Sequence, residues 1–227
     1  MNINFCSAFR NSAHYVDKYL QRIALLRILM PNDSFHVVAG EGDSTDETKR
    51  MLELNAKWTQ IPVRVVDVSH GGPVFGSTEA PERMVALSKV CNTMLDNIDR
   101  EADALVYVES DLDWMPHVIC TLIERALWRK DGFDVFAPMV MAGEAFYDTW
   151  GFRCDGQRFS PFPPFHPALK GKKIVEIESA GSCLVMRAQV AHECRIRNDY
   201  CLVGWCEDAR GKGYKIAACT DLEVYQR

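Results

Sequence analysis

The chain has 227 residues, which fits one α/β domain or two small ones and is long enough for a substantial core. Its net charge of −5 at pH 7 offers no general attraction for nucleic acid or an anionic membrane, although it is compatible with a local basic groove. Nine cysteines are scattered without a Cys-x-x-Cys pair, which favours buried thiols in a reducing compartment and predicts a cytoplasmic protein. We expect no membrane segment, because no apolar run is long enough to span a bilayer.

Strand-like and helix-like patterns alternate along the chain. Short apolar runs of β-forming residues predict strands at 3–9, 35–39, 63–68, 105–108 and 133–137. Apolar residues at helical spacing predict helices over 15–30, after a capping box at Ser44 and Glu47, from Pro81 and over 118–127. Further strands are expected at 174–177, 182–186 and 215–219.

This alternation predicts an α/β fold. We expect a Rossmann-like, mainly parallel twisted sheet flanked by helices, with a smaller mixed sheet toward the C-terminus. In a sheet of this kind, ligands bind at the carboxyl ends of the strands. The residues that follow each predicted strand are therefore the first candidates for a functional site.

Polar residues follow the first and second predicted strands. Phe9 and Arg10 end the first strand, and Glu41 and Asp43 lie in the loop after the second. Neither a dinucleotide-binding nor a P-loop glycine pattern occurs at the first turn. Because acidic loops suit the hydrogen-bond donors of a base and a ribose, Glu41 and Asp43 are candidate nucleoside ligands.

Three carboxylates follow the predicted buried strand at 105–108, namely Glu109, Asp111 and Asp113. Asp111 and Asp113 are two residues apart, so in an extended chain their side chains point the same way, with Cα atoms about 7 Å apart. Such carboxylates repel one another unless a cation joins them, and oxygen ligands favour Mg²⁺ or Mn²⁺ over Zn²⁺. We therefore predict a metal site at Asp111 and Asp113. The alternative is a solvated acidic turn before a helix that starts near Pro116.

The segment 143–170 is long, irregular and rich in aromatic residues and prolines. Long loops inside compact domains are uncommon and often functional. We predict that Tyr147, Asp148 and Trp150 form a wall for a sugar, because aromatic faces stack on sugar rings and a carboxylate can bond hydroxyls. Gly181 would let a sugar approach the backbone closely. The alternative is a packed cover over the edge of the sheet.

The order of these pieces resembles a GT-A-fold nucleotide-sugar glycosyltransferase. The resemblance is carried by the acidic loop 41–48, the stretch Ser110–Asp113 and the late pair Glu207 and Asp208. The middle of the chain, about 82–153, also resembles the fungal capsule-associated (cryptococcal-type) mannosyltransferase family. The matching pieces there are 82–84, Leu87, 91–92 and 146–153. The chain departs from the common GT-A pattern because its last strand carries no His that could serve as a metal ligand.

The resemblance implies one GT-A domain over 1–227, with a nucleotide-binding half over about 1–115 and an acceptor-binding half over about 116–227. Asp111 and Asp113 would hold the metal and the diphosphate of the donor. Asp208 would be the general base for the acceptor hydroxyl, with Glu207 beside it.

Together, the residue patterns and the resemblance give the following site candidates. On the donor side they are Phe9, Arg10, Glu41, Asp43, Arg83, Ser110 and Asp111. On the sugar or acceptor side they are Trp114, Tyr147, Asp148, Trp150 and Gly181.

These features predict a metal-dependent glycosyltransferase. It would move a sugar from a UDP- or GDP-type nucleotide sugar to a hydroxyl acceptor, with Mn²⁺ or Mg²⁺ as the cofactor. We expect a carbohydrate acceptor, but a modified base in nucleic acid also presents a hydroxyl. Two alternatives are a sugar-nucleotide-binding protein without transfer activity and a nucleotidyltransferase. The late carboxylate pair disfavours the first, and the absence of a Gly-rich basic signature after the first strand disfavours the second.

Overall fold

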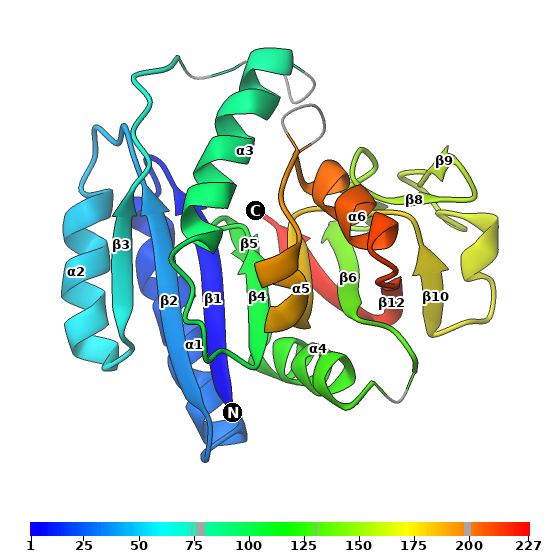
Figure 1. Cartoon of the computed structure of the whole chain (residues 1–227), viewed down its shortest axis with the longest axis horizontal. Coiled ribbons are helices and arrows are strands. Elements are labelled where there is room, and N and C mark those ends of the chain that lie inside the picture. Colours follow the sequence, from blue (N-terminus) through cyan, green and yellow to red (C-terminus); the bar gives the residue numbers. More distant parts are fainter. Residues whose placement is uncertain (74, 76–79, 130, 198–200) are drawn as a thin grey trace.

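The computed structural model describes residues 1–73, 75, 80–129, 131–197 and 201–227. Within these residues, ten strands form one sheet with helices packed on both faces (Figure 1). The order of the eight strands along the main path is β10-β12-β6-β11-β4-β1-β2-β3, while β5 pairs with β12 and β7 pairs with β6. The predicted α/β fold with a mainly parallel sheet is confirmed.

The N-terminal half is a parallel βαβ array. Its strands are β1 (Asn2–Phe9), β2 (Ser34–Glu41), β3 (Val63–Asp67) and β4 (Ala104–Val108), and all neighbours pair in parallel. The connecting helices are α1 (Ala13–Leu29), α2 (Thr48–Thr59) and α3 (Pro81–Leu95). Because Phe9 pairs with Glu41, β1 and β2 end level with each other. Their following loops therefore meet at one edge of the sheet.

The C-terminal half continues the same sheet. Its strands are β6 (Val135–Ala142), β10 (Ile174–Ile177), β11 (Cys183–Arg187) and β12 (Ile216–Gln226). Strand β11 runs antiparallel to both β4 and β6, and so joins the two halves. The expected smaller mixed sheet is thus an extension of the main one. In the described part of the chain, the pair lying outside that sheet is β8 (Arg153–Cys154) with β9 (Gln157–Arg158).

Short elements complete the fold. Strand β5 (Leu112–Asp113) precedes α4 (Pro116–Trp128), and β7 (Ala145–Phe146) and the 3-10 turn η1 (Pro167–Leu169) lie in the segment predicted to be irregular. Helix α5 (Ala188–Glu193) was not predicted from the sequence. Helix α6 (Cys201–Gly211) packs against α3.

The predicted capping box before α2 is wrong. The side chain of Ser44 accepts a hydrogen bond from the amide of Asn11 at 3.0 Å instead of capping the helix. Asp46 takes over the start of α2 and accepts a bond from the amide of Thr48 at 3.0 Å. Ser44 therefore binds the loop after β1, although the local sequence pattern predicts that it caps the helix.

The core lies between the sheet and its helices, and all five residues of β4 are buried. All nine cysteines are free thiols, and eight of them are buried. Among the described residues, no helix is both long enough and apolar enough to cross a membrane.

Candidate functional site

Two adjoining cavities meet at Glu109, directly after the carboxyl end of β4, and one of them extends to the ends of β1 and β2. The Asp111 cavity has a volume of about 580 Å³ and the Asp148 cavity about 570 Å³. Each cavity is named after an aspartate that lines that cavity and not the other. Both are lined by Arg83, Leu87, Glu109 and Tyr147. These shared residues form the boundary at which a molecule bound in one cavity could react with a molecule in the other.

The Asp111 cavity collects most of the predicted donor-side residues. Phe9 and Arg10 reach it from the end of β1, and Ser110 and Asp111 from the turn after β4. Arg83 enters from the first turn of α3, where Pro81 opens the helix as predicted. The wall is completed by backbone and side chains of Gly40, Gly42, Val68, His70, Phe75, Ala86 and Val90, among others.

The chain turns sharply after β4. The amide of Leu112 donates to the carbonyl of Glu109 at 3.2 Å, and the amide of Glu109 donates to the carbonyl of Ser182 at 2.9 Å. The stretch is therefore not extended, and the expected alternation of side chains does not apply to it. Glu109 and Asp111 line the cavities, and Asp111 Oδ2 accepts a hydrogen bond from Gln226 Nε2 at 2.8 Å.

Asp113 lies elsewhere and lines neither cavity. Strand β5 pairs with the end of β12, which places Asp113 opposite Tyr225. There its carboxylate is held by Arg22 from α1 and by Arg227, whose Nη2 and Nε lie 2.6 and 3.0 Å from Oδ2. The structure thus separates Asp113 from Asp111 and brings Glu109 to Asp111 instead.

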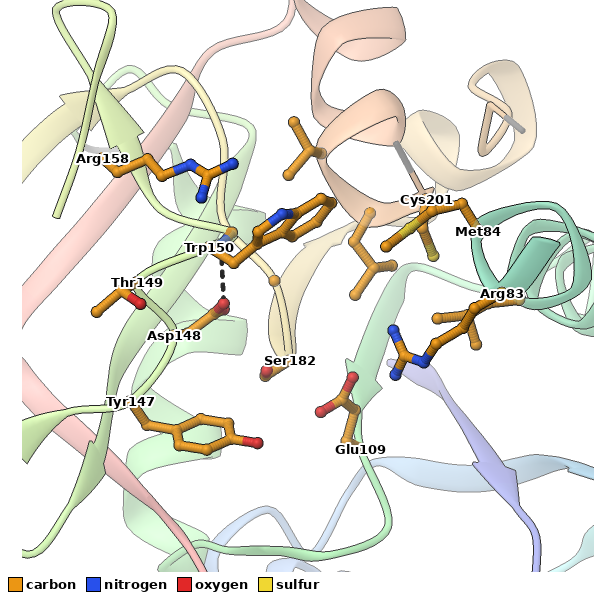
Figure 2. Close-up of a pocket in the computed structure, with 15 residues that line it drawn as sticks. Arg83, Met84, Glu109, Tyr147, Asp148, Thr149, Trp150, Arg158, Ser182 and Cys201 are labelled. Carbon is orange, nitrogen blue, oxygen red and sulfur yellow. Dashed lines mark hydrogen bonds between the residues drawn. The ribbon is translucent and has the colours of Figure 1, made fainter. Parts of the chain in front are cut away.

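Glu109 is a buried carboxylate at the boundary of the two cavities. Burial, together with the neighbouring charges of Asp111 and Asp148, raises its pKa to about 7, although the side chain of Ser182 and the charge of Arg83 oppose the shift. In Figure 2, the side chains of Arg83 and Glu109 reach toward each other across the cavity. The Glu109–Asp111 pair therefore concentrates negative charge that a cation would neutralise.

Glu41 and Asp43 were predicted to bind a nucleoside, but neither is among the residues that line the Asp111 cavity. Asp43 accepts hydrogen bonds from the amides of His70 at 3.0 Å and Gly71 at 3.2 Å. These bonds hold the pKa of the Asp43 carboxyl below its usual range, although burial opposes them. Arg10 donates to the carbonyls of Gly72 and Pro73, at 2.9 and 3.3 Å. Asp43 and Arg10 thus anchor one segment beside the cavity.

The Asp148 cavity contains four of the five predicted sugar-side residues, Tyr147, Asp148, Trp150 and Gly181 (Figure 2). Tyr147 is about half exposed and lies on the boundary with the Asp111 cavity. The guanidinium of Arg153 lies 5.8 Å from the centre of the Trp150 ring. The aromatic segment is therefore partly a wall of the cavity. Other aromatic residues of this segment, Phe146, Phe152 and Phe159, pack on one another in the core.

The prediction that Trp114 contacts a sugar or an acceptor is wrong. Trp114 is 1% exposed and packs on Phe5 and Tyr19, with ring centroids 6.1 and 6.3 Å apart. The turn after β4 points this side chain into the layer between the sheet and α1. There it also contacts Arg22, which lies 5.9 Å from the ring centre.

Asp208 was predicted to be the general base for the acceptor hydroxyl, with Glu207 beside it. They lie instead in the interior of α6 and line neither cavity. Asp208 Oδ2 accepts bonds from Lys212 Nζ at 2.7 Å and from the amide of Arg195 at 2.9 Å, and Glu207 pairs with Arg197 at 3.2 Å. The residues of α6 that line the Asp148 cavity are Cys201, Leu202 and Val203.

The two carboxylates of the Asp111 cavity fit a divalent metal in their chemistry. Glu109 and Asp111 supply only oxygen atoms, which suits Mg²⁺ or Mn²⁺. Within the described residues, no cluster of three or more His, Cys, Asp or Glu side chains could hold a metal alone. A metal bound here would take its other ligands from a diphosphate and from water.

Comparisons with known proteins agree with this architecture. No protein-family profile and no curated protein matches the sequence. Among solved structures, TarS 1–349 of S. aureus in complex with UDP-GlcNAc matches with a TM-score of 0.63 and 14% identity. A mannosyltransferase of Pyrobaculum calidifontis with GDP-Man and Mn²⁺ gives 0.62 and 12%. Glucosyl-3-phosphoglycerate synthase of Mycobacterium tuberculosis with Mn²⁺, UDP and phosphoglyceric acid gives 0.59 and 11%.

These matches cover 99–100% of this chain and between 56% and 70% of the neighbours, so the chain spans little more than half the length of some of them. At such low identity the likeness establishes the fold alone. The predicted GT-A fold is thereby confirmed. The resemblance of the middle of the chain to the fungal capsule-associated family is not shown by any comparison.

Sequence reasoning did not assign Glu109 a role, although it noted the residue among the three carboxylates. The signal was present, because Glu109 and Asp111 have the same spacing as Asp111 and Asp113. Ser182 was missed as well. Ser182 lines the Asp148 cavity, and its carbonyl accepts a hydrogen bond from the amide of Glu109. It therefore connects the turn before β11 to the turn after β4.

Proposed function

We propose that this protein is a metal-dependent glycosyltransferase that moves a sugar from a nucleoside-diphosphate sugar to a hydroxyl acceptor. The observation that carries the proposal is the placement of Glu109 at the junction of two cavities of similar size, with Asp111 in one of them. A transfer between two bound molecules needs two adjoining sites. A protein that only binds a nucleotide sugar has no need of the second.

The donor nucleotide would occupy the Asp111 cavity. Its base and ribose would lie against the loops after β1 and β2, where Phe9, Gly40 and Gly42 form the wall. A Cβ atom on Gly42 would come within 2.5 Å of the amide nitrogen of Ser69, so the loop passes its neighbour too closely for a side chain. Glycine at this position therefore lets the loop after β2 pack directly on the segment after β3, which forms the same wall.

The diphosphate would lie at Asp111, with the sugar pointing across the boundary toward the Asp148 cavity. Glu109 and Asp111 would hold Mn²⁺ or Mg²⁺ together with the diphosphate. When bound, the divalent cation stabilises the negative charge that develops on the diphosphate as the sugar–oxygen bond breaks. Arg83 lines both cavities and brings its positive charge to the same oxygens.

The acceptor would enter the Asp148 cavity, where Trp150 and Tyr147 offer aromatic surface for a sugar ring. This chemistry favours a carbohydrate acceptor. Arg83 and Arg158 also line this cavity, so salt dependence separates the two classes of acceptor: binding of a nucleic-acid acceptor would weaken steeply with salt.

The test is sugar release and transfer from UDP-glucose, UDP-GlcNAc and GDP-mannose, the donor types bound by the structural neighbours. Each donor is incubated with the protein and Mn²⁺, with or without a panel of simple glycosides. We expect one donor to give nucleoside diphosphate at a rate that EDTA abolishes. Intact donors throughout the panel, despite measurable nucleotide binding, would favour the binding-protein alternative.

A further inference from the structure

Asp148 is a buried carboxylate that the fold does not fully satisfy. It is 8% exposed and follows β7, in the wall of the Asp148 cavity. Its Oδ1 accepts a hydrogen bond from the amide of Gly151 at 3.0 Å, whereas its Oδ2 is a buried oxygen without a hydrogen-bond partner. Buried polar atoms in folded proteins are nearly always paired, so an unpaired carboxylate oxygen that borders a cavity is a candidate for contact with a ligand.

Two glycines make room for this carboxylate. A Cβ atom on Gly151 would lie 2.6 Å from Asp148 Oδ1, and one on Gly181 would lie 2.8 Å from Asp148 Oδ2. Any side chain at either position would therefore collide with the carboxylate. Gly151 and Gly181 belong to two separate segments, the loop after β7 and the turn before β11, and both segments line the Asp148 cavity.

Asp148 and Asp111 lie on different sides of Glu109. Asp111 lines only the Asp111 cavity, Asp148 lines only the Asp148 cavity, and Glu109 lines both. With a diphosphate at Asp111 and the sugar extending across the boundary, the face of the anomeric carbon opposite the leaving group would be turned toward the Asp148 cavity.

We infer that Asp148 is the general base that takes the proton from the acceptor hydroxyl, and that the sugar is transferred with inversion at its anomeric carbon. This inference rests on the glycosyltransferase function proposed above. The acceptor oxygen forms a bond to the anomeric carbon while the bond from that carbon to the diphosphate oxygen breaks. The bonding electron pair leaves with the nucleoside diphosphate, and the hydroxyl proton moves to Asp148 Oδ2 and later to solvent.

The environment of Asp148 suits this role. Burial raises its pKa to about 7, although the amides of Gly151 and Gly181 and the side chain of Ser182 oppose the shift. A base with a pKa near neutrality combines a useful deprotonated fraction with a useful affinity for the proton. Asp208, by contrast, is already paired with Lys212 and lies outside both cavities.

The test uses water as the acceptor, because every nucleotide-sugar donor can be hydrolysed without knowledge of the natural acceptor. UDP-glucose, UDP-GlcNAc and GDP-mannose are incubated with Mn²⁺ and the parent protein, and the first anomer released is identified by proton NMR before mutarotation. We expect the anomer opposite to that of the donor. Asp148→Asn should lower the rate of sugar release by about 10²-fold or more, while the Mn²⁺-dependent thermal shift by the nucleoside diphosphate is unchanged.

The matched control is Asp155→Asn, which removes an exposed carboxylate from the turn between β8 and β9 and should keep the parent rate. Release of the retained anomer by the parent, or the parent rate in Asp148→Asn, overturns the inference while the proposed function stands. Loss of activity in Asp208→Asn but not in Asp148→Asn would return the base to α6. A parent that neither binds nucleoside diphosphates nor releases sugar contradicts the proposed function itself. The anomer assignment needs no variant, so it decides the question even where Asp148→Asn folds poorly.

Discussion

The Asp111 cavity and the Asp148 cavity share a boundary but are built differently. The first lies where parallel strands end level with one another, and it is lined by residues at the ends of β1, β2 and β4 together with the segment after β3 and one side of α3. The second is made from the irregular segment after β6, the turn before β11 and the first residues of α6. The shape of the Asp111 cavity thus depends mainly on the register of the sheet, whereas the shape of the Asp148 cavity depends on tertiary contacts between loops. Variants on the two walls should therefore fail in different ways.

The largest effect is expected at the turn after β4. Asp111→Asn should lower sugar release by about 10²-fold or more, because it removes a carboxylate that would hold the metal and its charge at the leaving group. Asp113→Asn is the matched control two residues away. It should keep the metal-dependent activity and cost about 1 kcal/mol of stability or less, because its ion pairs are partly exposed.

Kinetics with varied Mn²⁺ and chemical denaturation of both variants check this pair. The reverse pattern, with Asp113→Asn inactive and Asp111→Asn active, would restore the metal site that the extended-chain argument placed at Asp111 and Asp113.

The two tryptophans should also separate stability from function. Trp114→Ala removes a buried ring from the layer between the sheet and α1, and should lower the free energy of unfolding by about 3 to 5 kcal/mol. Trp150→Ala opens the wall of the Asp148 cavity and should reduce transfer to an acceptor more than it reduces hydrolysis of the donor. Urea titrations and parallel transfer and hydrolysis assays measure both. An equal loss of transfer and hydrolysis in Trp150→Ala would count against an acceptor wall.

The buried Asp148 predicts a specific pH dependence of stability. Its pKa is raised from 3.8 in the unfolded chain to about 7 in the folded protein, mainly by burial. The folded state thus holds this proton more tightly, so the free energy of unfolding falls as pH rises from about 4 to about 7. Asp148→Asn lacks this contribution, and relative to the parent it should gain about 1 to 3 kcal/mol between pH 5 and pH 8.

Urea titrations of parent and Asp148→Asn at both pH values test this sign. A difference between the two proteins that does not change with pH would mean that the Asp148 carboxyl titrates in the folded protein as it does in the unfolded chain.

The smallest effect is expected at the anchor beside the Asp111 cavity. Asp43 holds the amides of His70 and Gly71, and His70 lines the cavity. Asp43→Asn should weaken nucleoside diphosphate binding a few-fold, because it loosens the His70 segment of the cavity wall without removing a side chain that lines the cavity. Glu47→Gln, which alters an exposed pair with Arg50 on α2, is the control and should bind as the parent does. Binding isotherms with each nucleotide make the comparison, and a loss of 10²-fold would indicate direct contact between Asp43 and the nucleotide.

The fold was predictable because its signals are local and repeated. Apolar strands such as Ala104–Val108 alternate with helices of clear periodicity, and Pro81 marks the start of α3. The same pattern also predicted which edge of the sheet carries the candidate site. These features depend on nearest neighbours in the sequence and on the rule that parallel strands end together.

The roles of single carboxylates were less predictable. The turn at Glu109 and the pairing of β5 with the end of β12 decide which of three acidic residues faces the cavities, and the partner strand lies more than 100 residues away. Asp208 shows the same limit, because its partner Arg195 belongs to another segment. Spacing predicts which residues gather at an edge, but tertiary pairing decides which of them are used to hold the fold.

The most direct measurement is the thermal unfolding of parent, Asp111→Asn and Asp113→Asn with UDP, GDP, CDP and TDP, each with and without Mn²⁺. A ligand at 100 times its dissociation constant adds about 2.7 kcal/mol to stability, which is a readily measured shift. We predict that at least one nucleotide stabilises the parent and Asp113→Asn only when Mn²⁺ is present, and that Asp111→Asn loses this response. No nucleotide response in the parent, or a full response in Asp111→Asn, would contradict the central claim that the cavity beside Glu109 and Asp111 is a metal-dependent donor site.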